Sequence, residues 1–394
     1  MSKFVKQVAV RATYMRGGTS KGVFFTPEDM PEATRLPGAA RDAFLRRVIG
    51  SPDPYGKQID GMGAATSSTS KTVIISKSTR PDCDVDYLFG QVAIDAPLVD
   101  WGGNCGNLTS AVGPFAIRRG LVAAPRDGDA VVRIWQANIG KKIIAHVPME
   151  DGEVVELGDF ELDGVTFPAA EVKLEFLDPG ADEDSAGGAM FPTGNTIDRL
   201  QIPGIGEVET TLINAGNPTV FIDAARLGLK GTETQDEVNG NPELLRTLET
   251  IRAHATVAMG LAATPQEASE KHQHVPKIAF AAAPASYRVS SGKTLEASDM
   301  EIIVRIMSMG KLHHAMTGTG AVAIAVACAI PGTILRRILG DKQPQRVRFG
   351  HTAGTLSVGA EAKQIDGEWK VTKALMSRSA RRLMEGVVLV PENR

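Results

Sequence analysis

The sequence predicts an α+β protein of two similar halves, each made mainly of strands around one apolar helix. Many short apolar or alternating runs, separated by turn residues that include 41 Gly and 22 Pro, indicate strands. Two nearly uncharged apolar runs, 108–117 and 321–330, indicate buried helices. Each run follows a polar, glycine-rich loop and has strands before and after it, so the order of elements repeats.

The first half is expected to contain two helices. Residues 39–49 have an amphipathic pattern that predicts a helix ended by Gly50. A second helix is expected from the Asn-Cys-Gly-Asn sequence at 104–107 to Arg118, with Asn104 or Asn107 as its N-cap. Strands are expected at 5–14, 23–25, 72–75, 85–95, 130–136, 143–147 and 153–157.

An acidic, glycine-rich stretch between residues 177 and 189 is the expected linker between the halves. Beyond it, helices are expected at 241–260, 298–307 and 321–330. Strands are expected at 208–213, 220–222, 277–283, 346–349, 355–358, 369–374 and 386–390.

Composition and charge exclude several classes of protein. A formal net charge of −3, without a basic stripe interleaved with aromatic residues, argues against nucleic-acid binding. No run of about 18 uncharged apolar residues occurs, so no membrane span is expected, and residues 1–10 lack the apolar core of a signal peptide. Cys83, Cys105 and Cys328 lack disulfide or zinc-finger spacing. We expect a cytoplasmic enzyme, with Cys83 at the surface and Cys328 in the core.

Cys105 stands between Asn104 and Gly106, at the start of the first apolar helix. A helix start carries unpaired N–H groups and the positive end of the helix dipole, which favour anions and a thiolate. A buried structural cysteine at a tight turn is the alternative interpretation. The polar neighbours favour the functional one, because inert core cysteines usually have apolar neighbours.

Two other stretches gather polar donors. Five hydroxyl residues at 66–70 precede Lys71, which begins a buried strand and is expected to project into a hydroxyl-lined pocket. The tight connection at 16–21 contains Arg16, Thr19, Ser20 and Lys21. It is not a phosphate-binding P-loop, because a strand follows rather than a helix. Solvated loops are the alternative for both stretches.

These pieces suggest one kind of chemistry. If both apolar helices point their N-termini at one cleft, their amides and the nearby cations would bind a di- or tricarboxylate. The same donors would stabilise an enolate formed by removing a proton beside a conjugated carboxylate. To act as the base, Lys71 needs a pKa below the usual value of about 10.4. Burial and neighbouring cations lower this pKa and a bound carboxylate raises it, and the sequence leaves that balance open.

The histidines do not form a metal-binding pattern. His272 and His274 flank one residue, and His313 and His314 are adjacent. Neither His-Glu-x-x-His nor Cys-x-x-Cys occurs, so no metal site is expected. We expect His313 or His314 to face the cleft and meet a carboxylate.

Several segments together resemble the PrpF family, whose members are 2-methylaconitate cis-trans isomerases of the 2-methylcitrate route of propionate breakdown. The similar segments cover most of the chain: 15–22, 58–63, 66–71, 103–107, 192–195, 308–316 and 376–381. The families of 4-oxalomesaconate tautomerase, methylitaconate Δ-isomerase and aconitate isomerase share segments 16–21 and 104–107. Residues 310–316 and 214–216 look most like the methylaconitate branch.

The resemblance implies the fold of diaminopimelate epimerase. That fold has two similar domains, each a curled, mainly antiparallel sheet around a central helix, with the active site in the cleft between them. The expected domains are 1–185, completed by strand 380–394, and 186–379. The epimerase has a cysteine at each helix entrance, but here the second entrance, 316–320, has none. This difference argues against a two-thiol racemase.

The resemblance also implies Lys71 as the proton-transfer base and Cys105 as an acid or a residue lining the site, without metal or organic cofactor. The expected reaction converts 2-methyl-trans-aconitate into 2-methyl-cis-aconitate by allylic proton removal, rotation within the dienolate and reprotonation. The residues expected to bind substrate are Arg16, Thr19, Ser20, Lys21, Ser67, Ser68, Ser70, Asn104, Gly106, Asn107, Thr193, Asn195, Ser308, Lys311, His313, His314, Met316 and Thr317.

Other interpretations remain open at this point. The enzyme could move the double bond, as an aconitate or methylitaconate Δ-isomerase or a 4-oxalomesaconate tautomerase does. It could instead be a non-enzymatic accessory protein of an aconitase-like 2-methylcitrate dehydratase, which is the functional partner expected in either case. A homodimer is expected. A hydrolase using Cys105 is disfavoured, because no accompanying His and Asn/Asp pair is readable.

Overall fold

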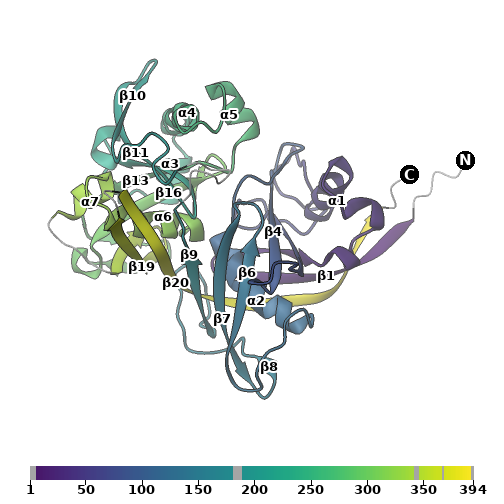
Figure 1. Cartoon of the computed structure of the whole chain (residues 1–394). Helices are drawn as coiled ribbons and strands as arrows, with labels where there is room; N and C mark the ends of the chain where they lie inside the picture. Colours follow the sequence, from purple (N-terminus) through teal and green to yellow (C-terminus); the bar gives the residue numbers. More distant parts are fainter. Residues whose placement is uncertain (1–5, 181–188, 341–345, 366–367, 392–394) are drawn as a thin grey trace, which may run out of the picture.

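The computed structural model describes residues 6–180, 189–340, 346–365 and 368–391 of the 394-residue chain. Figure 1 shows two lobes, one from each half of the sequence. The long strand β20 (Glu368–Pro391) starts in the second lobe and crosses into the first. Among the described helices, none is long and apolar enough to cross a membrane.

The first lobe is a curled sheet that closes around one helix. β20 completes the ring, because its residues 373–379 pair with β9 and its residues 380–391 pair with β1. Helix α2 (Gly106–Arg118) runs inside and is buried along almost its whole length. The strands follow one another round the ring as β1 (Gln7–Gly17), β2 (Ser20–Phe25), β3 (Lys71–Lys77), β4 (Val85–Val92), β6 (Gly128–Gln136), β7 (Lys141–Glu150), β9 (Glu171–Leu177) and β20.

The second lobe repeats this arrangement around helix α6 (Gly318–Ala329), which is apolar on all sides and buried. Its strands are β11 (Gly206–Ala215), β12 (Asn217–Asp223), β13 (Lys277–Ala282), β16 (Ile302–Ser308), β18 (Arg346–His351), β19 (Gly354–Ile365) and the first part of β20. In both lobes the successive pairings are antiparallel, parallel, antiparallel, parallel, antiparallel and antiparallel. The predicted α+β fold of two similar halves is confirmed.

Each crossover between parallel strands carries a helix at the same place in the repeat. Helices α1 (Ala39–Ile49) and α4 (Pro242–Ala258) precede β3 and β13. The shorter elements are β5 (Val99–Asp100), β8 (Glu153–Val154), β10 (Asp198–Ile202), β14 (Tyr287–Arg288), β15 (Thr294–Leu295), β17 (Lys311–Leu312), α3 (Gln235–Asn239), α5 (Pro265–Lys271), α7 (Ile334–Leu339) and the 3-10 turns Pro27–Asp29, Glu32–Thr34, Ala224–Leu227 and Ala297–Asp299.

Several sequence predictions are confirmed in detail. Helix α1 has the predicted limits, and Gly50 ends it in the left-handed conformation with φ 86°. Helices α2, α4 and α6 and the hairpin at 16–21 lie where expected. Cys328 is buried in the core, and burial raises the pKa of its thiol. The expected linker lies mostly at 181–188, outside the described residues, and the domain limits 1–185 and 186–379 stay predictions.

Four predictions are wrong. The helix expected at 298–307 is absent, because residues 302–308 form strand β16, whose seven residues are all buried. A strand covered on both faces is a continuous apolar run, which periodicity cannot separate from a short helix. The two strands expected at 369–374 and 386–390 are one strand, β20. The N-cap of α2 is Cys105, not Asn104 or Asn107. Cys83 is buried rather than at the surface.

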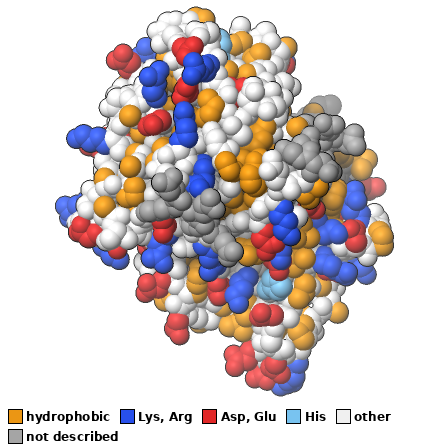
Figure 2. All heavy atoms as spheres, turned by 60° about the vertical axis from the view of Figure 1, so that its left-hand side comes forward, with side chains coloured by type: hydrophobic (Ala, Val, Ile, Leu, Met, Phe, Trp, Pro, Cys, Tyr) orange, Lys and Arg blue, Asp and Glu red, His pale blue; other side chains and the backbone are white. Residues whose placement is uncertain are grey.

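The face of the molecule in Figure 2 has mixed charge. Lys and Arg side chains lie among Asp and Glu side chains, and hydrophobic side chains show in patches between them. The described side chains of this face therefore form no extended surface of one sign that would suit a polymer such as nucleic acid.

The N-termini of α2 and α6 meet where Gly106 lies against Gly318. A Cβ atom on Gly318 would lie 2.3 Å from the carbonyl carbon of Gly106 and 2.4 Å from the backbone nitrogen of Asn107. Backbone atoms cannot swing aside as side chains do. Both positions therefore require glycine, and this contact fixes the two helix starts relative to each other.

We expect Gly318→Ala to destabilise the protein by about 1–3 kcal/mol, because the added methyl group forces the two helix starts apart. Urea unfolding of the purified variant measures the effect. Gly386→Ala is the control, since its Cβ would meet nothing within 4 Å. Equal stability of the Gly318 and Gly386 variants would contradict the proposed steric requirement.

Candidate active site

A pocket lies at the meeting point of the two helix starts and takes its lining from both lobes. None of its described lining residues is Asp or Glu, and most offer hydrogen-bond donors. The lining residues are Ser20, Lys71, Asn104, Cys105, Gly106, Asn107, His274, Lys277, Ser308, His313, Thr317, Gly318 and Thr319.

Lys71 is the first residue of β3 and is 4% exposed. Its Nζ donates to Oε1 of Gln91 at 2.5 Å and lies 5.0 Å from the centre of the Phe89 ring. The amide nitrogen of Gln91 donates to the backbone carbonyl of Ser70 at 2.9 Å, which turns the amide oxygen toward the lysine. Burial lowers the pKa of Lys71, and the neighbouring Cys105 sulfur opposes this shift.

Lys277 is the first residue of β13 and is buried on the second-lobe side of the pocket. Its Nζ donates to Ser308 Oγ at 3.1 Å and lies 3.2 Å from Nδ1 of His274. Burial, followed by the charge of Lys71, lowers the pKa of Lys277 to about 7. Burial and the same two lysines hold the pKa of His274 well below its usual value.

Two buried donors of the pocket lining have no partner among the described residues. They are the side-chain nitrogen Nδ2 of Asn104 and the ring nitrogen Nε2 of His274. When Lys277 donates to Nδ1 of His274, the neutral ring carries its proton on Nε2. An unpaired buried donor costs free energy, so these atoms indicate a ligand with acceptor oxygens.

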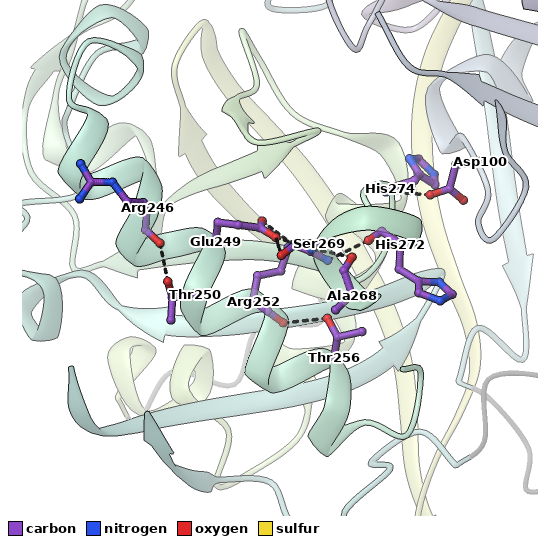
Figure 3. A network of polar contacts seen from close by, with 10 residues as sticks. All are labelled: Asp100, Arg246, Glu249, Thr250, Arg252, Thr256, Ala268, Ser269, His272 and His274. Carbon is purple, nitrogen blue, oxygen red and sulfur yellow. Dashed lines mark hydrogen bonds and ion pairs between the residues drawn. The ribbon is translucent and has the colours of Figure 1, made fainter. Parts of the chain in front are cut away.

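The loop before β13 is anchored from both lobes (Figure 3). Buried Arg252 of α4 donates to both carboxylate oxygens of Glu249, at 2.7 and 2.6 Å, and to the carbonyl of His272 at 2.8 Å. The backbone N–H of His274 donates to Oδ2 of Asp100 in the first lobe at 2.9 Å. These contacts fix the position from which Lys277 enters the pocket.

Ser68 joins the two lobes through the adjacent histidines. The backbone N–H of Ala315 donates to Nδ1 of His313 at 3.1 Å, so the neutral His313 ring carries its proton on Nε2. That Nε2 lies 2.9 Å from Ser68 Oγ, which lies 3.2 Å from Nδ1 of His314. Burial lowers the pKa of both histidines, strongly for His313. The neutral donor chain runs from His313 through Ser68 to His314.

Asparagines hold the helix entrances in place. Asn104 and Asn217 exchange hydrogen bonds between side chain and backbone across the lobes, at 2.8 and 2.9 Å. Asn107 donates to the carbonyl of Met316 at 3.1 Å, while Nε of Arg378 donates to Oδ1 of Asn107 at 3.0 Å. Burial lowers the pKa of Arg378 to about 9. The pocket therefore requires both lobes.

Many of the residues predicted for the site line this pocket, but others have different surroundings. Thr193 and Asn195 bond the carboxylate of Asp198 at 2.9 and 3.1 Å and are absent from the pocket lining. Lys311 is exposed as the first residue of β17, where it pairs with Ser308 of β16. The predicted residues in the lining are Lys71, Cys105, Ser20, Asn104, Gly106, Asn107, Ser308, His313 and Thr317.

The hydroxyl residues at 66–70 were predicted to line the pocket, but most of their contacts lie within the first lobe. Ser70 Oγ donates to the carbonyl of Val92 at 2.8 Å and accepts from Gln58 at 2.8 Å, so it is occupied within the first lobe. Ser67 accepts from Gln91 through its backbone carbonyl at 3.3 Å. These serines hold the strand entrance and the partner of Lys71, whereas Ser68 contacts the second lobe.

A second pocket adjoins the first and shares Ser20 with it. Arg16 and Lys21, both predicted for the site, line this second pocket with Arg381. Arg16 of β1 stands between the other two cations, opposite Lys21 of β2 on one side and opposite Arg381 of β20 on the other. Burial and the charge of Arg381 lower the pKa of Arg16 to about 10. Thr19, Ser68 and His314 also line this pocket.

Six residues of the site were missed from the sequence. Lys277, His274, Gly318 and Thr319 line the pocket, and Gln91 and Arg378 contact residues that line it. Lys277 begins the strand expected at 277–283, just as Lys71 begins its strand, and this parallel was the available signal. His274 was considered only as a metal ligand. The described residues contain no group of three or more His, Cys, Asp or Glu placed to hold a metal ion.

The fold and the donor-lined pocket between two opposed helix starts define an epimerase-like α+β protein with a small-molecule site between its lobes. The chain belongs to the PrpF family, since the family model described as "PrpF protein" matches residues 7–391.

Full-length relatives support this assignment. Proteins named 2-methyl-aconitate isomerase from Cupriavidus necator and Shewanella oneidensis are 63% and 64% identical, covering 98% and 99% of this chain and 98% of each relative. A crystal structure of methylitaconate-delta-isomerase is 41% identical, with a TM-score of 0.77 over 98% of this chain and 96% of that one. A probable proline racemase from Agrobacterium radiobacter shares the fold alone, with a TM-score of 0.54 at 11% identity over 98% of this chain and 93% of its own.

The lowered pKa of Lys277 has a consequence for stability without substrate. Between about pH 7 and the usual lysine pKa of 10.5, the unfolded chain binds a proton at this lysine that the folded protein does not bind. The free energy of unfolding therefore rises with pH by up to about 1.4 kcal/mol per unit from this group. We expect Lys277→Met to remove this contribution, as measured by urea unfolding at several pH values from about 7.5 to 9.

The informative quantity is the difference in unfolding free energy between wild type and variant, because it isolates one group. This difference should grow with pH in favour of the wild type. Lys293→Met, at an exposed position, serves as the control. Parallel pH profiles for wild type and Lys277→Met would contradict the shifted pKa.

Proposed function

We propose that the protein converts 2-methyl-trans-aconitate into 2-methyl-cis-aconitate without metal or organic cofactor. The observation that carries the proposal is Lys71, a buried amine with a lowered pKa, at a pocket lined with donors from two helix starts. The relatives named 2-methyl-aconitate isomerase, at 63–64% identity over nearly the whole chain, support the choice of substrate.

The pocket suits a small polyanion for three reasons. Two helix N-termini present backbone N–H groups and positive dipole ends to it. Asn104 and His274 offer donors that lack partners among the described residues. No described residue of the lining is acidic, so a tricarboxylate meets no like charge there.

The proton chemistry follows from bond order. The neutral amine of Lys71 takes a proton from the allylic carbon, and the electron pair of that C–H bond spreads into a dienolate that ends on a carboxylate. The former double bond gains single-bond character and rotates. The ammonium of Lys71 then returns the proton to the same carbon. Donors fixed around the carboxylate stabilise the charge that develops there. Cys105, beside Lys71, acts as an acid or lines the site.

A second candidate is double-bond migration. A relative from Eubacterium barkeri named 3-methylitaconate isomerase is 42% identical over 98% of both chains. The same dienolate, protonated at a different carbon, gives an itaconate-type product. The identity of the product separates the two reactions.

The remaining proposals concern the setting of the reaction. We propose functional pairing with an aconitase-like 2-methylcitrate dehydratase, assembly as a homodimer, and a cytoplasmic location. The location is supported by the three cysteines, all unpaired thiols. The domain limits 1–185, completed by 380–394, and 186–379 are supported by the pairing of β20 with β1.

Proton NMR in D₂O tests the reaction. Chelator-treated protein is mixed with 2-methyl-trans-aconitate, and in a second tube with trans-aconitate. We expect the cis isomer to appear with deuterium at the allylic carbon, because rotation requires the proton to leave. An itaconate-type product would favour the second candidate, and neither exchange nor product would refute the proposal for both substrates.

We expect Lys71→Ala to abolish turnover in a folded protein, since no other group takes the allylic proton. Lys77→Ala is a matched control at the exposed end of the same strand and should keep full activity. Initial rates and circular dichroism of both variants give the comparison. A folded and active Lys71→Ala enzyme would remove Lys71 as the base. Cys105→Ser should lose less activity, unless a thiol shares the proton transfer.

A further inference from the structure

Because the two lobes repeat the same arrangement of strands, Lys71 of the first lobe has a structural counterpart in the second lobe. Lys71 begins β3, and Gln91 of the antiparallel strand β4 stands opposite it. Lys277 begins β13, the equivalent strand. Ala279 pairs with Ile306, so continuing the register by two residues places Lys277 opposite Ser308. Each lysine donates to this cross-strand partner, at 2.5 Å for Lys71 and 3.1 Å for Lys277.

The helix entrances repeat in the same way. Cys105 is the N-cap of α2, and Thr317 is the N-cap of α6. The pocket thus has a lysine and an N-cap residue from each lobe, facing the two helix starts that meet at Gly106 and Gly318. A ligand in this pocket therefore meets Lys71 from the first lobe and Lys277 from the second.

The two lysines differ in their neighbours. Lys71 has the Cys105 sulfur as a partner. The N-cap in the Lys277 lobe is Thr317, whose hydroxyl accepts from the backbone N–H of Gly320 at 3.2 Å and is therefore engaged in capping. Lys277 also contacts Nδ1 of His274, whose other ring nitrogen, Nε2, has no partner among the described residues. Lys277 is therefore the cationic donor that the second lobe offers to a carboxylate in the pocket.

We propose that Lys277 binds the substrate carboxylate conjugated with the reacting carbon, and that its amine takes up a proton from solvent when the substrate binds. This inference rests on the proposed isomerisation. The ammonium so formed faces the oxygen on which dienolate charge develops, opposite the base Lys71. The proton that Lys71 removes from carbon is a different proton, which joins the solvent-exchangeable hydrogens of the Lys71 amine before one of them returns to the carbon.

The charges around Lys277 explain why binding drives this protonation. Burial and several cationic or titratable neighbours disfavour the ammonium, whereas Asp100 and Cys105 favour it, and its pKa is about 7 without ligand. A bound carboxylate adds negative charge beside the amine and raises this pKa. The charged neighbours that oppose the ammonium are Lys71 of β3 and Arg252 of α4. The other titratable groups near it are His274 of the preceding loop and His313 of the loop before α6, both held neutral by their lowered pKa values.

Calorimetric titration with trans-aconitate, in buffers of different ionisation enthalpy, measures the number of protons taken up on binding. The Lys71→Met background prevents turnover during the titration. The pKa of Lys277 is about 7 with Lys71 present and rises when the Lys71 charge is removed, so in this background we expect proton uptake that is small at pH 6 and grows from pH 7 to pH 9. Lys71→Met/Lys277→Met should take up almost none at pH 8 and bind more weakly. Lys71→Met/Lys293→Met is the matched control and should behave as the background.

Lys277→Arg keeps a charge that does not titrate, so in the same background it should bind trans-aconitate without proton uptake. If the methionine variant does not fold, Lys277→Gln replaces it. Uptake that survives the loss of Lys277 overturns the proposal.

The calorimetric test of Lys277 and the NMR test of the reaction can fail independently. Isomerisation seen by NMR, with proton uptake independent of Lys277, refutes only the role of Lys277. Uptake that depends on Lys277, without isomerisation of either compound by the wild type, supports the binding role and refutes the proposed reaction.

Discussion

The contact between Gly106 and Gly318 is the constraint on which the site depends. Each glycine lets the backbone of one central helix approach the other more closely than any side chain would permit. Both helix starts therefore open into one pocket, and their N-cap residues, Cys105 and Thr317, stand at its wall. The curled sheets serve this contact, because each encloses one helix and leaves only its N-terminal end available to the other lobe.

A pocket formed in this way has a surplus of positive potential. Two helix dipoles and two buried lysines point into a space whose described lining includes no carboxylate. The protein tolerates this arrangement because burial moves the pKa values of Lys71 and Lys277 downward, so that the amines are held toward the neutral form. An anionic ligand neutralises this surplus of positive potential. The positive potential that is unfavourable in the empty pocket therefore favours binding of the ligand.

The sequence predicted the repeated order of elements, because each central helix is a rare uncharged apolar run between recognisable strands. It also indicated Lys71 and Cys105, since each is a reactive residue in an unusual local setting. It missed Lys277, whose significance depends on the register of β13 with β16, and a register between distant segments is not a local signal. Strand β16 was mistaken for a helix because burial on both faces removes alternation. The resemblance, rather than local chemistry, suggested Thr193, whose hydroxyl bonds Asp198 instead of lining the pocket.

The repeat is symmetric in backbone but asymmetric in chemistry. A racemase that uses two opposed thiols needs a reactive group at both helix entrances, whereas here one entrance carries Cys105 and the other carries Thr317, whose hydroxyl caps its own helix. Cis-trans isomerisation through a dienolate removes and returns the proton at one carbon, so it needs a base on one side only. The opposite side is then available for a group that holds charge instead of moving the reacting proton. A lysine retained in the lobe whose helix entrance carries Thr317 instead of a thiol fits that division of roles, because an ammonium beside a carboxylate stabilises the dienolate without competing for its proton.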